Sequence, residues 1–322
     1  MLKKVLLGIL FVVLAGTSGW LFFQAPQHTY WRSQSPVLND QNYRIVSFTL
    51  PEELYFADVR VPLEIFHTRE SLERELLVNT YWHSSTLLLM KRANRWFPVI
   101  EPILELYQIP EDFKYLAMIE SNLSNARSPS GAVGFWQFLE GTAKDYGLEI
   151  NRDVDERYHI ENATAAACRY LNDSYARFGD WALVAAAYNA GNRRISNFLE
   201  EQLADSYFDL LMAEETERYL YRILAMKIIM QNPGRFGFYP EIEKLYHPLP
   251  YQPMVIDKSI DNWAVFCQQH GITYKLLKMY NPWLRTNRLT VRRGKEYVIK
   301  MPVEPFNLTH RRLNELYLEH QD

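Results

Sequence analysis

The chain has few of the residues that define a metal, redox or nucleic-acid-binding protein. Its 322 residues include two cysteines, Cys168 and Cys267, and neither has a partner at the spacing of metal ligands. The eight histidines form no HxxxH pair or similar cluster, so we expect no metal and no other cofactor. Basic residues are scattered and the formal net charge is -3, which argues against nucleic acid as a partner.

Apolar and aromatic residues are abundant. They make up 48% and 14% of the sequence, which includes 8 Trp and 21 Tyr. This composition and length fit a folded protein with one large or two modest domains. Trp and Tyr are rigid and amphipathic, so they suit a carbohydrate groove as well as an ordinary core.

The first residues resemble a targeting element. Lys3-Lys4 precede a run from Val5 to Phe23 that carries no charge. Residues 1–24 are therefore predicted to be a signal peptide or an N-terminal membrane anchor, and the protein is expected to be exported to the periplasm or cell envelope. No cysteine stands directly after Leu14-Ala15-Gly16, where a lipoprotein signal would place it, which disfavours a lipid anchor, and no clean A-x-A site is present. An uncleaved anchor is favoured, and cleavage stays open.

The middle of the chain is predicted to be mainly α. Residues 25–60 are rich in polar residues and proline, which is typical of an extended tether. Residues 61–245 show helical periodicity and no βαβ rhythm. We expect one apolar helical face across 68–94, a second across 97–107, and helices after Pro110 and over 136–146, 162–177, 182–189 and 219–230.

The pattern changes after Pro250. Residues 250–303 are predicted to form a small βααβ module, with strands at 254–256 and 296–301 around helices at 263–270 and 274–280. A tail helix is expected within 304–322.

One short stretch carries the chemistry. Glu120-Ser121 ends an apolar helix just before a Gly/Ser loop, and no second acid stands in an obvious pairing position. Ordinary glycoside hydrolysis needs two carboxyl groups. A lone glutamate with a raised pKa could act first as general acid and then as base, provided that a tethered hydroxyl of the sugar attacks the reacting carbon. The product would be an internal anhydro ring.

Several motifs, in order, resemble the lytic transglycosylases with a soluble lytic transglycosylase (SLT) domain, and best of all a membrane-bound branch of that family. They are Glu120-Ser121, the run from Ser128 to Phe138, Gly141-Thr142-Ala143, Tyr146-Gly147-Leu148 and Ala187-Tyr188-Asn189-Ala190-Gly191. The similarity runs from roughly Val61 to Tyr239. It implies a lysozyme-like catalytic domain that acts on peptidoglycan glycan strands.

The resemblance also implies a reaction and its residues. The bond cleaved would be the β-1,4 bond between N-acetylmuramic acid and N-acetylglucosamine, giving 1,6-anhydromuramic ends, with Glu120 as the catalytic acid and base. The matching substrate-binding positions are Ser128, Gln137, Tyr188, Asn189 and Tyr219. Some have plainer readings, because Gln137 could cap a helix and Tyr188 or Tyr219 could be core aromatics.

The sequence departs from the family at several points. The segment from Leu123 to Ser128 is one residue shorter than usual and lacks a proline, which puts the role of Ser128 in question. His159-Ile160 replaces an Asp-Pro pair, and Gly191-Asn192-Arg193 replaces a Gly-x-Gly. We expect these changes to tune the site and not to abolish it.

Residues 250–303 resemble a LysM module in their second half, through Tyr280-Asn281-Pro282-Trp283 and Tyr297 to Pro302. The first half fits poorly, because Asp257 to Ile260 replaces the Gly-Asp-Ser/Thr turn. Glycan binding and a purely structural role are both open for this module.

Two other functions remain open. A lysozyme-like hydrolase would need a second carboxylate roughly 5 to 9 Å from Glu120, with Asp155, Glu156 and Glu215 as candidates. A non-catalytic peptidoglycan-binding scaffold would fit the degenerate module but not the intact Glu120-Ser121 pair.

Overall fold

The computed structural model describes residues 45–303, 313 and 315. The predicted targeting element at 1–24, the tether up to residue 44 and nearly all of the tail segment at 304–322 lie outside the described residues. Within the described part of the chain, no helix combines the length and apolarity needed to cross a membrane.

The described chain divides into two compact units. The helical unit comprises residues 45–149 and 156–246, and the C-terminal unit comprises residues 150–155 together with the chain from 247 onward. The six residues 150–155 thus belong to the C-terminal unit although the sequence inserts them in the helical one. No expectation from sequence pointed to this interleaving.

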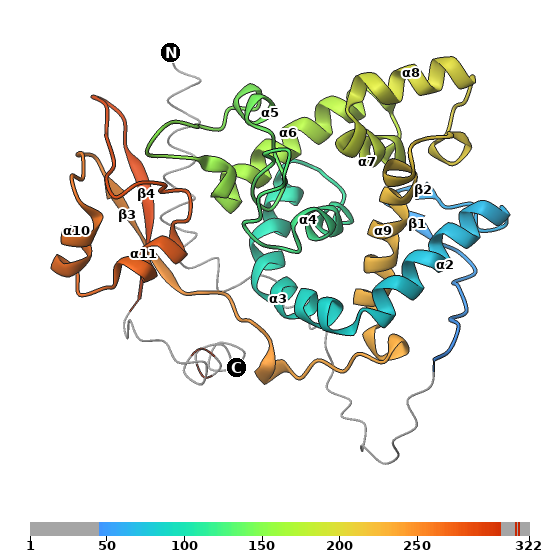
Figure 1. Cartoon of the computed structure of the whole chain (residues 1–322), viewed down its shortest axis with the longest axis horizontal. Coiled ribbons are helices and arrows are strands. Elements are labelled where there is room, and N and C mark those ends of the chain that lie inside the picture. The colour runs from blue at the N-terminus through green and yellow to red at the C-terminus, as the bar shows by residue number, and fades with distance from the viewer. Residues whose placement is uncertain (1–44, 304–312, 314, 316–322) are drawn as a thin grey trace. The chain divides into compact units, whose positions relative to one another are not determined.

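The helical unit begins with a short antiparallel hairpin, β1 (Tyr55–Phe56) and β2 (Val59–Arg60), and is otherwise helical (Figure 1). Its α-helices are α2 (Phe66–Tyr81), α3 (His83–Leu106), α4 (Phe113–Ser121), α5 (Glu140–Asp145), α6 (Ile160–Phe178), α7 (Trp181–Ala190), α8 (Asn192–Gln202) and α9 (Glu214–Gln231). Short 3-10 turns are η1 (Glu156–Tyr158), η2 (Tyr207–Asp209), η3 (Pro233–Phe236) and η4 (Ile242–Lys244). The predicted mainly α fold is confirmed.

Helix α4 lies in the middle of this unit, packed against α3 and α9 (Figure 1). Phe113, Leu116, Ala117 and Met118 are all inaccessible to solvent, so apolar neighbours surround the helix on several sides. Lys114 is also buried and is held by Glu101 of α3, with 2.8 Å between Nζ and Oε1. A helix enclosed in this way is a rigid support for the residues at its end.

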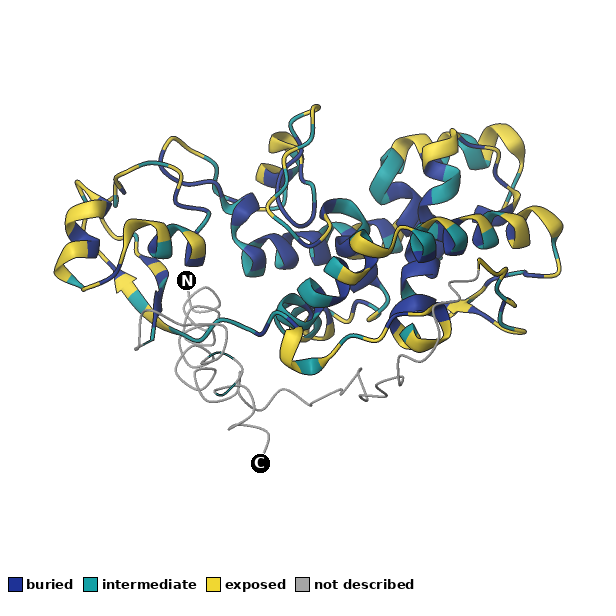
Figure 2. Ribbon diagram, turned by 60° about the horizontal axis from the view of Figure 1, so that its bottom comes forward, coloured by how far each residue is buried: buried dark blue, intermediate teal, exposed yellow. Residues whose placement is uncertain are grey.

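Helices α2 and α3 carry both buried and exposed residues, whereas α9 is exposed only at its two ends. Figure 2 shows the buried segments gathered in the interior of the helical unit. Helix α2 packs on α9, α3 on α6, and α7 on both α6 and α9. The alanines of α6 and α7 allow close approach: Ala166, Ala167, Ala185, Ala186 and Ala187 have no exposed surface. Cys168 is buried among them as a free thiol, as expected for a small apolar side chain.

Several boundaries differ from the predictions, and α8 was not predicted. The face expected across 68–94 is split between α2 and α3, because the chain turns at Trp82. The helix expected at 136–146 starts only at Glu140, because residues 136–138 belong to a bridged turn in which Val133 pairs with Phe138. The expected tether does not extend to residue 60, since Leu50, Leu54 and Phe56 are buried in the helical unit and Phe56 packs on Phe113 at 5.2 Å between ring centroids.

The C-terminal unit has the predicted βααβ order. Strand β3 (Tyr251–Ile256) pairs antiparallel with β4 (Tyr297–Pro302), and α10 (Trp263–Gln269) and α11 (Tyr274–Tyr280) lie between them in sequence. Trp263 and Leu277 have no exposed surface and form its small core with Ile299. Strand β3 begins three residues before its predicted start, whereas β4 has the predicted length and is shifted by one residue.

Candidate active site

Glu120 stands at the last turn of α4, where the helix is forced to stop. Asn122 and Leu123 both adopt left-handed backbone conformations, with φ of 52° and 50°. Asparagine tolerates this region, whereas a buried leucine there is strained. The chain therefore turns sharply out of the enclosed helix directly after the glutamate, and the Ser121 hydroxyl bonds back to the Ala117 carbonyl at 3.1 Å.

The carboxyl group of Glu120 is half-buried and accepts a hydrogen bond from the hydroxyl of Tyr219, a residue of α9 that is 2% exposed. Burial raises the pKa of Glu120, because the charged form loses water; the Tyr219 bond acts in the opposite direction. The net pKa is above the ordinary value. A carboxyl of this kind holds its proton at a higher pH than an exposed one.

Two charged residues of α9 act on the same carboxyl. The positive charge of Arg222 lowers the pKa of Glu120 and the negative charge of Glu215 raises it, both less than burial does. The Arg222 guanidinium also donates to the carbonyl of Ile119 at 3.3 Å. Tyr219 and Arg222 are three residues apart, so both lie on one face of α9.

Tyr188, near the end of α7, is the next group at this site. Its hydroxyl donates to the carbonyl of Trp136 at 2.7 Å, and the negative charge of Glu120 is one of the causes that raise its pKa, after burial. The Tyr188 ring contacts Trp136, Phe138 and Tyr170 at centroid distances of 6.3, 6.4 and 5.3 Å. Tyr188 is therefore held by an aromatic cluster and faces the catalytic candidate.

Trp136 anchors this cluster. Its indole has no exposed surface and Nε1 donates to the Thr164 hydroxyl of α6 at 2.9 Å. A buried indole N–H needs such a partner. The contact fixes the backbone of residue 136, whose carbonyl in turn receives the Tyr188 hydroxyl.

The side chain of Gln137 joins two parts of the same loop. Its backbone is left-handed, with φ of 47°, and its amide Nε2 donates to the carbonyls of Ala126 and Gly134 at 3.2 and 2.8 Å. It lies before α5 and is not the cap of that helix, which is Leu139. The amide nitrogen thus staples the two sides of the loop, and its role in contacting sugar stays a prediction.

Ser128 lies at the tip of the same loop. Its Oγ accepts a hydrogen bond from the Ala132 N–H at 3.0 Å and is 2.8 Å from Ser130 Oγ, and its N–H donates to the Ala132 carbonyl at 2.9 Å. The shortened segment before it therefore still closes into an ordered turn. Substrate contact by Ser128 stays a prediction.

Arg157 hydrogen-bonds the Ser128–Phe138 loop. The guanidinium, on a side chain that is almost fully buried, donates to the carbonyls of Gly131 and Phe138, each at 3.3 Å. The backbones also touch: a Cβ built on Gly134, whose φ is +82°, would lie 2.0 Å from the Arg157 carbonyl oxygen. Only glycine fits there. The loop position therefore depends on the position of residue 157.

Asn189 has a structural partner. Its Oδ1 accepts from the hydroxyl of Thr216, a buried residue in the first turn of α9, at 2.8 Å. This bond ties the end of α7 to the start of α9, the two helices that carry Tyr188 and Tyr219. The role of Asn189 in the substrate-binding wall stays a prediction.

The candidate second carboxylates differ in their surroundings. Both oxygens of Glu156 are used: Oε2 accepts from the Glu149 N–H at 2.7 Å and Oε1 from Asn162 Nδ2 at 2.8 Å. Asp155 belongs to the C-terminal unit, where its N–H donates to the Trp283 carbonyl at 2.9 Å. Glu215 is exposed and is the candidate whose charge acts on Glu120.

A half-buried carboxyl with a raised pKa, next to a tyrosine hydroxyl and an aromatic wall, can deliver a proton to a bound glycosidic oxygen. Comparison with protein families finds two matches. Residues 101–209 match the transglycosylase SLT domain, and residues 252–305 match the soluble lytic transglycosylase C-terminal LysM-like domain. The chain therefore carries both of these domains.

Two named proteins are similar to parts of this chain. Membrane-bound lytic murein transglycosylase D of Escherichia coli K12 is 30% identical over 175 residues, which are 52% of this chain and 38% of that protein. Peptidoglycan transglycosylase gp16 of Escherichia phage T7 is 34% identical over 101 residues, which are 31% of this chain and 8% of that protein. The chain thus spans well under half of each relative.

A solved structure of lytic transglycosylase Slt from Pseudomonas aeruginosa is also similar. It is 21% identical, with a TM-score of 0.36, and the match covers 47% of this chain and 26% of that one.

Arg222, Thr216 and Arg157 were not predicted as site residues. Arg222 could have been found from its place one turn after Tyr219 on a predicted helix. Arg157 gave no local signal, because its partners are backbone carbonyls some 20 residues away in sequence.

Proposed function

We propose that this protein is a peptidoglycan lytic transglycosylase that cleaves the β-1,4 bond between N-acetylmuramic acid and N-acetylglucosamine without water. The observation that carries the proposal is Glu120, which lies within the residues that match the SLT domain. Burial raises the pKa of its carboxyl, and the Tyr219 hydroxyl donates a hydrogen bond to it. The names of the two curated relatives support the same reaction class.

The steps balance without a second protein carboxylate. Protonated Glu120 gives its proton to the glycosidic oxygen, and the bond from that oxygen to C1 of the muramic acid breaks. The 6-hydroxyl of the same muramic acid then attacks C1, and the Glu120 carboxylate removes its proton. Glu120 ends in its starting state, and the product carries a 1,6-anhydro ring. Because the attacking hydroxyl belongs to the bound sugar, its effective concentration is high.

Tyr219 and Arg222 fit the charge changes of this cycle. The carboxylate formed after proton delivery receives the Tyr219 hydrogen bond and the Arg222 charge, and both stabilise it. Burial, in contrast, favours the protonated starting form. Glu120 is therefore balanced between the two states that the reaction requires.

One observation keeps a second function in view. Glu215 is exposed and its charge acts on Glu120, so it could serve a lysozyme-like hydrolase as the carboxylate on the other side of the sugar. Glu120→Gln and Glu215→Gln together separate the two reactions, since each removes one carboxyl group and nearly keeps the size of the side chain.

The test is digestion of purified sacculi followed by mass spectrometry of the soluble products. A transglycosylase releases anhydro ends, loses release in Glu120→Gln and retains it in Glu215→Gln. Reducing ends that vanish in Glu215→Gln would show a hydrolase, and no soluble product from the wild type would favour a binding scaffold. Anhydro products from Glu120→Gln would refute the proposed role of Glu120.

We further propose that the protein works in the cell envelope, where its substrate lies. The charge-free run from Val5 to Phe23 and the membrane-bound relative support export with an N-terminal anchor or signal. N-terminal sequencing of the mature protein distinguishes the two. Ser128, Gln137, Tyr188 and Asn189 are proposed as the sugar-contacting wall.

A further inference from the structure

The segment Ile150–Asp155 is a built part of the C-terminal unit, although the sequence places it between α5 and η1. Val154 has no exposed surface and pairs with Leu284 in a short antiparallel bridge. The Asp155 N–H donates to the Trp283 carbonyl at 2.9 Å. The segment turns on itself through Asn151, whose Oδ1 accepts from the N–H groups of residues 153 and 154 at 2.8 and 2.9 Å.

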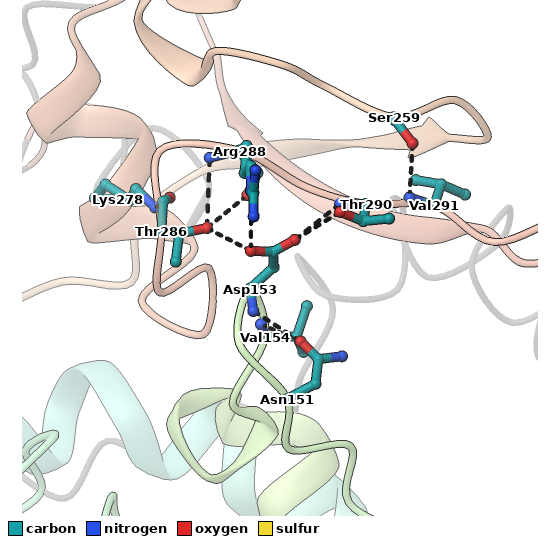
Figure 3. A network of polar contacts seen from close by, with 9 residues as sticks. All are labelled: Asn151, Asp153, Val154, Ser259, Lys278, Thr286, Arg288, Thr290 and Val291. Atoms are coloured by element: carbon teal, nitrogen blue, oxygen red, sulfur yellow. Dashed lines mark hydrogen bonds and ion pairs between the residues drawn. The ribbon is translucent and has the colours of Figure 1, made fainter.

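Asp153 is the polar centre of this arrangement (Figure 3). One carboxylate oxygen accepts the Thr286 hydroxyl at 2.9 Å, and the other accepts both the hydroxyl and the N–H of Thr290, at 2.8 and 3.2 Å. Arg288 Nε lies 3.7 Å from the first oxygen, and the Asp153 carbonyl accepts the Arg285 N–H at 2.8 Å. The carboxylate is largely buried, so these donors replace its water.

The two ends of the segment are stiff. The Glu156 N–H donates to the Glu149 carbonyl at 2.9 Å, and the Glu156 side chain accepts the Glu149 N–H at 2.7 Å. Glu149 and Glu156 therefore form a closed neck around the six residues. The next residue after this neck is Arg157.

Arg157 determines where the loop of the candidate site lies. It donates to the carbonyls of Gly131 and Phe138, and its own carbonyl is in contact with Gly134. A shift of Arg157 by a few tenths of an ångström must move this loop, because no space separates the two backbones. The route from Asp153 to the loop is thus covalent over four residues and then a direct contact.

We propose that Asp153 is a positioning residue, which acts through the neck and Arg157 to set the position of the Ser128–Phe138 loop beside Glu120. The consequence for activity rests on the proposed function, but the positional effect does not.

The first test is hydrogen exchange followed by mass spectrometry on the full chain, comparing wild type with Asp153→Ala. We expect exchange at 286–291 and at 150–155 to accelerate roughly tenfold or more, because three donors lose a charged acceptor. Exchange in 128–138 should accelerate as well, while α4 stays protected. Asp257→Ala removes an exposed acid of the same unit and should change neither segment.

Two outcomes would overturn the proposal: a loosened C-terminal unit with an unchanged 128–138 loop, or no change anywhere. If Asp153→Ala fails to fold, Thr290→Val removes one hydroxyl donor and keeps the backbone one, so the same comparison can be made. Asp153→Asn retains an acceptor oxygen and should restore part of the protection.

The second test is turnover of soluble glycan strands. A displaced loop should raise KM several-fold with a smaller change in kcat, because Glu120 and Tyr219 stay in place. Equal loss of both parameters in all variants would indicate a merely structural role and contradict positioning. If the wild type releases no product, the proposed function fails, and the exchange experiment still decides the positional claim.

Discussion

Replacing Tyr219 with phenylalanine is the sharpest perturbation of the candidate site. The Tyr219 ring is 2% exposed and its hydroxyl donates to Glu120. Phenylalanine keeps the ring and its packing and removes that donor. Because the lost bond stabilises the carboxylate, Tyr219→Phe should raise the pKa of Glu120 further.

The size of the effect follows from the charge on Glu120 during the reaction. A hydrogen bond to a charged group contributes about 1.5–3 kcal/mol. If about half of the carboxylate charge has developed in the transition state, the loss there is about 0.7–1.5 kcal/mol, which corresponds to a rate lower by about three- to tenfold. Total loss of activity is not expected, since the Glu120 carboxyl that would deliver the proton stays in place.

The assay is the initial rate of anhydro-product release from glycan strands as a function of pH. Under the proposed mechanism the alkaline limb of the profile reports the loss of the Glu120 proton, so this limb should move to higher pH in Tyr219→Phe. Tyr221→Phe is the matched control: its hydroxyl, on the same helix, is 3.4 Å from Thr68 Oγ1. That variant should keep the wild-type profile.

A limb that stays in place or moves to lower pH in Tyr219→Phe would refute this account of Glu120. So would a tenfold slower Tyr221→Phe, because the effect would then come from the helix as a whole.

Three further predictions concern stability. Burial raises the pKa of Glu120 in the folded state. The folded protein therefore loses stability as the pH rises from the unfolded-state pKa of about 4.3 through the higher folded-state pKa. Glu120→Gln should be more stable than wild type to urea at neutral pH and equally stable in acid. Gly134→Ala should lower the free energy of unfolding by more than about 3 kcal/mol, because the new Cβ meets the Arg157 carbonyl and φ is positive. The control is Gly131→Ala, also at positive φ but with no atom within 4 Å, which should cost only about 1 kcal/mol in the same denaturation assay. Burial alone would raise the pKa of Asp153, but hydrogen bonds from Thr290 and Thr286 and the Arg288 charge together lower it. The contribution of Asp153 to folding stability is therefore present above the unfolded-state pKa of about 3.9 and should be lost as the pH falls below that value. Acid titration followed by circular dichroism would show this loss, and Asp153→Asn should depend less on pH.

Much of the architecture was predictable because it depends on local pattern. Helix α11 begins and ends where its apolar spacing predicts, and α6 and α7 differ from prediction by at most two residues at each end. Helix α9 begins five residues before its predicted start. The break at Trp82 was missed because residues on both sides have the same helical periodicity. Residues 136–138 were misassigned because an apolar aromatic run fits a helix as well as a buried turn.

By itself, the sequence determined which functional motifs are present. They are one glutamate at the end of an apolar helix, a glycine-rich loop and an Ala-Tyr-Asn motif, in the order of a transglycosylase SLT domain. Each of these signals lies within a few neighbouring residues. Local pattern was therefore sufficient to find them.

Tertiary structure decided how Glu120 is tuned and what holds its loop. The Tyr219 hydroxyl comes from 99 residues away, and Asp153 finds Thr286 across 133 residues. Such contacts leave no local trace in the sequence, because hydrogen bonds and burial depend on distance in space. The raised pKa of Glu120 and the membership of residues 150–155 in the C-terminal unit both depend on contacts of this kind.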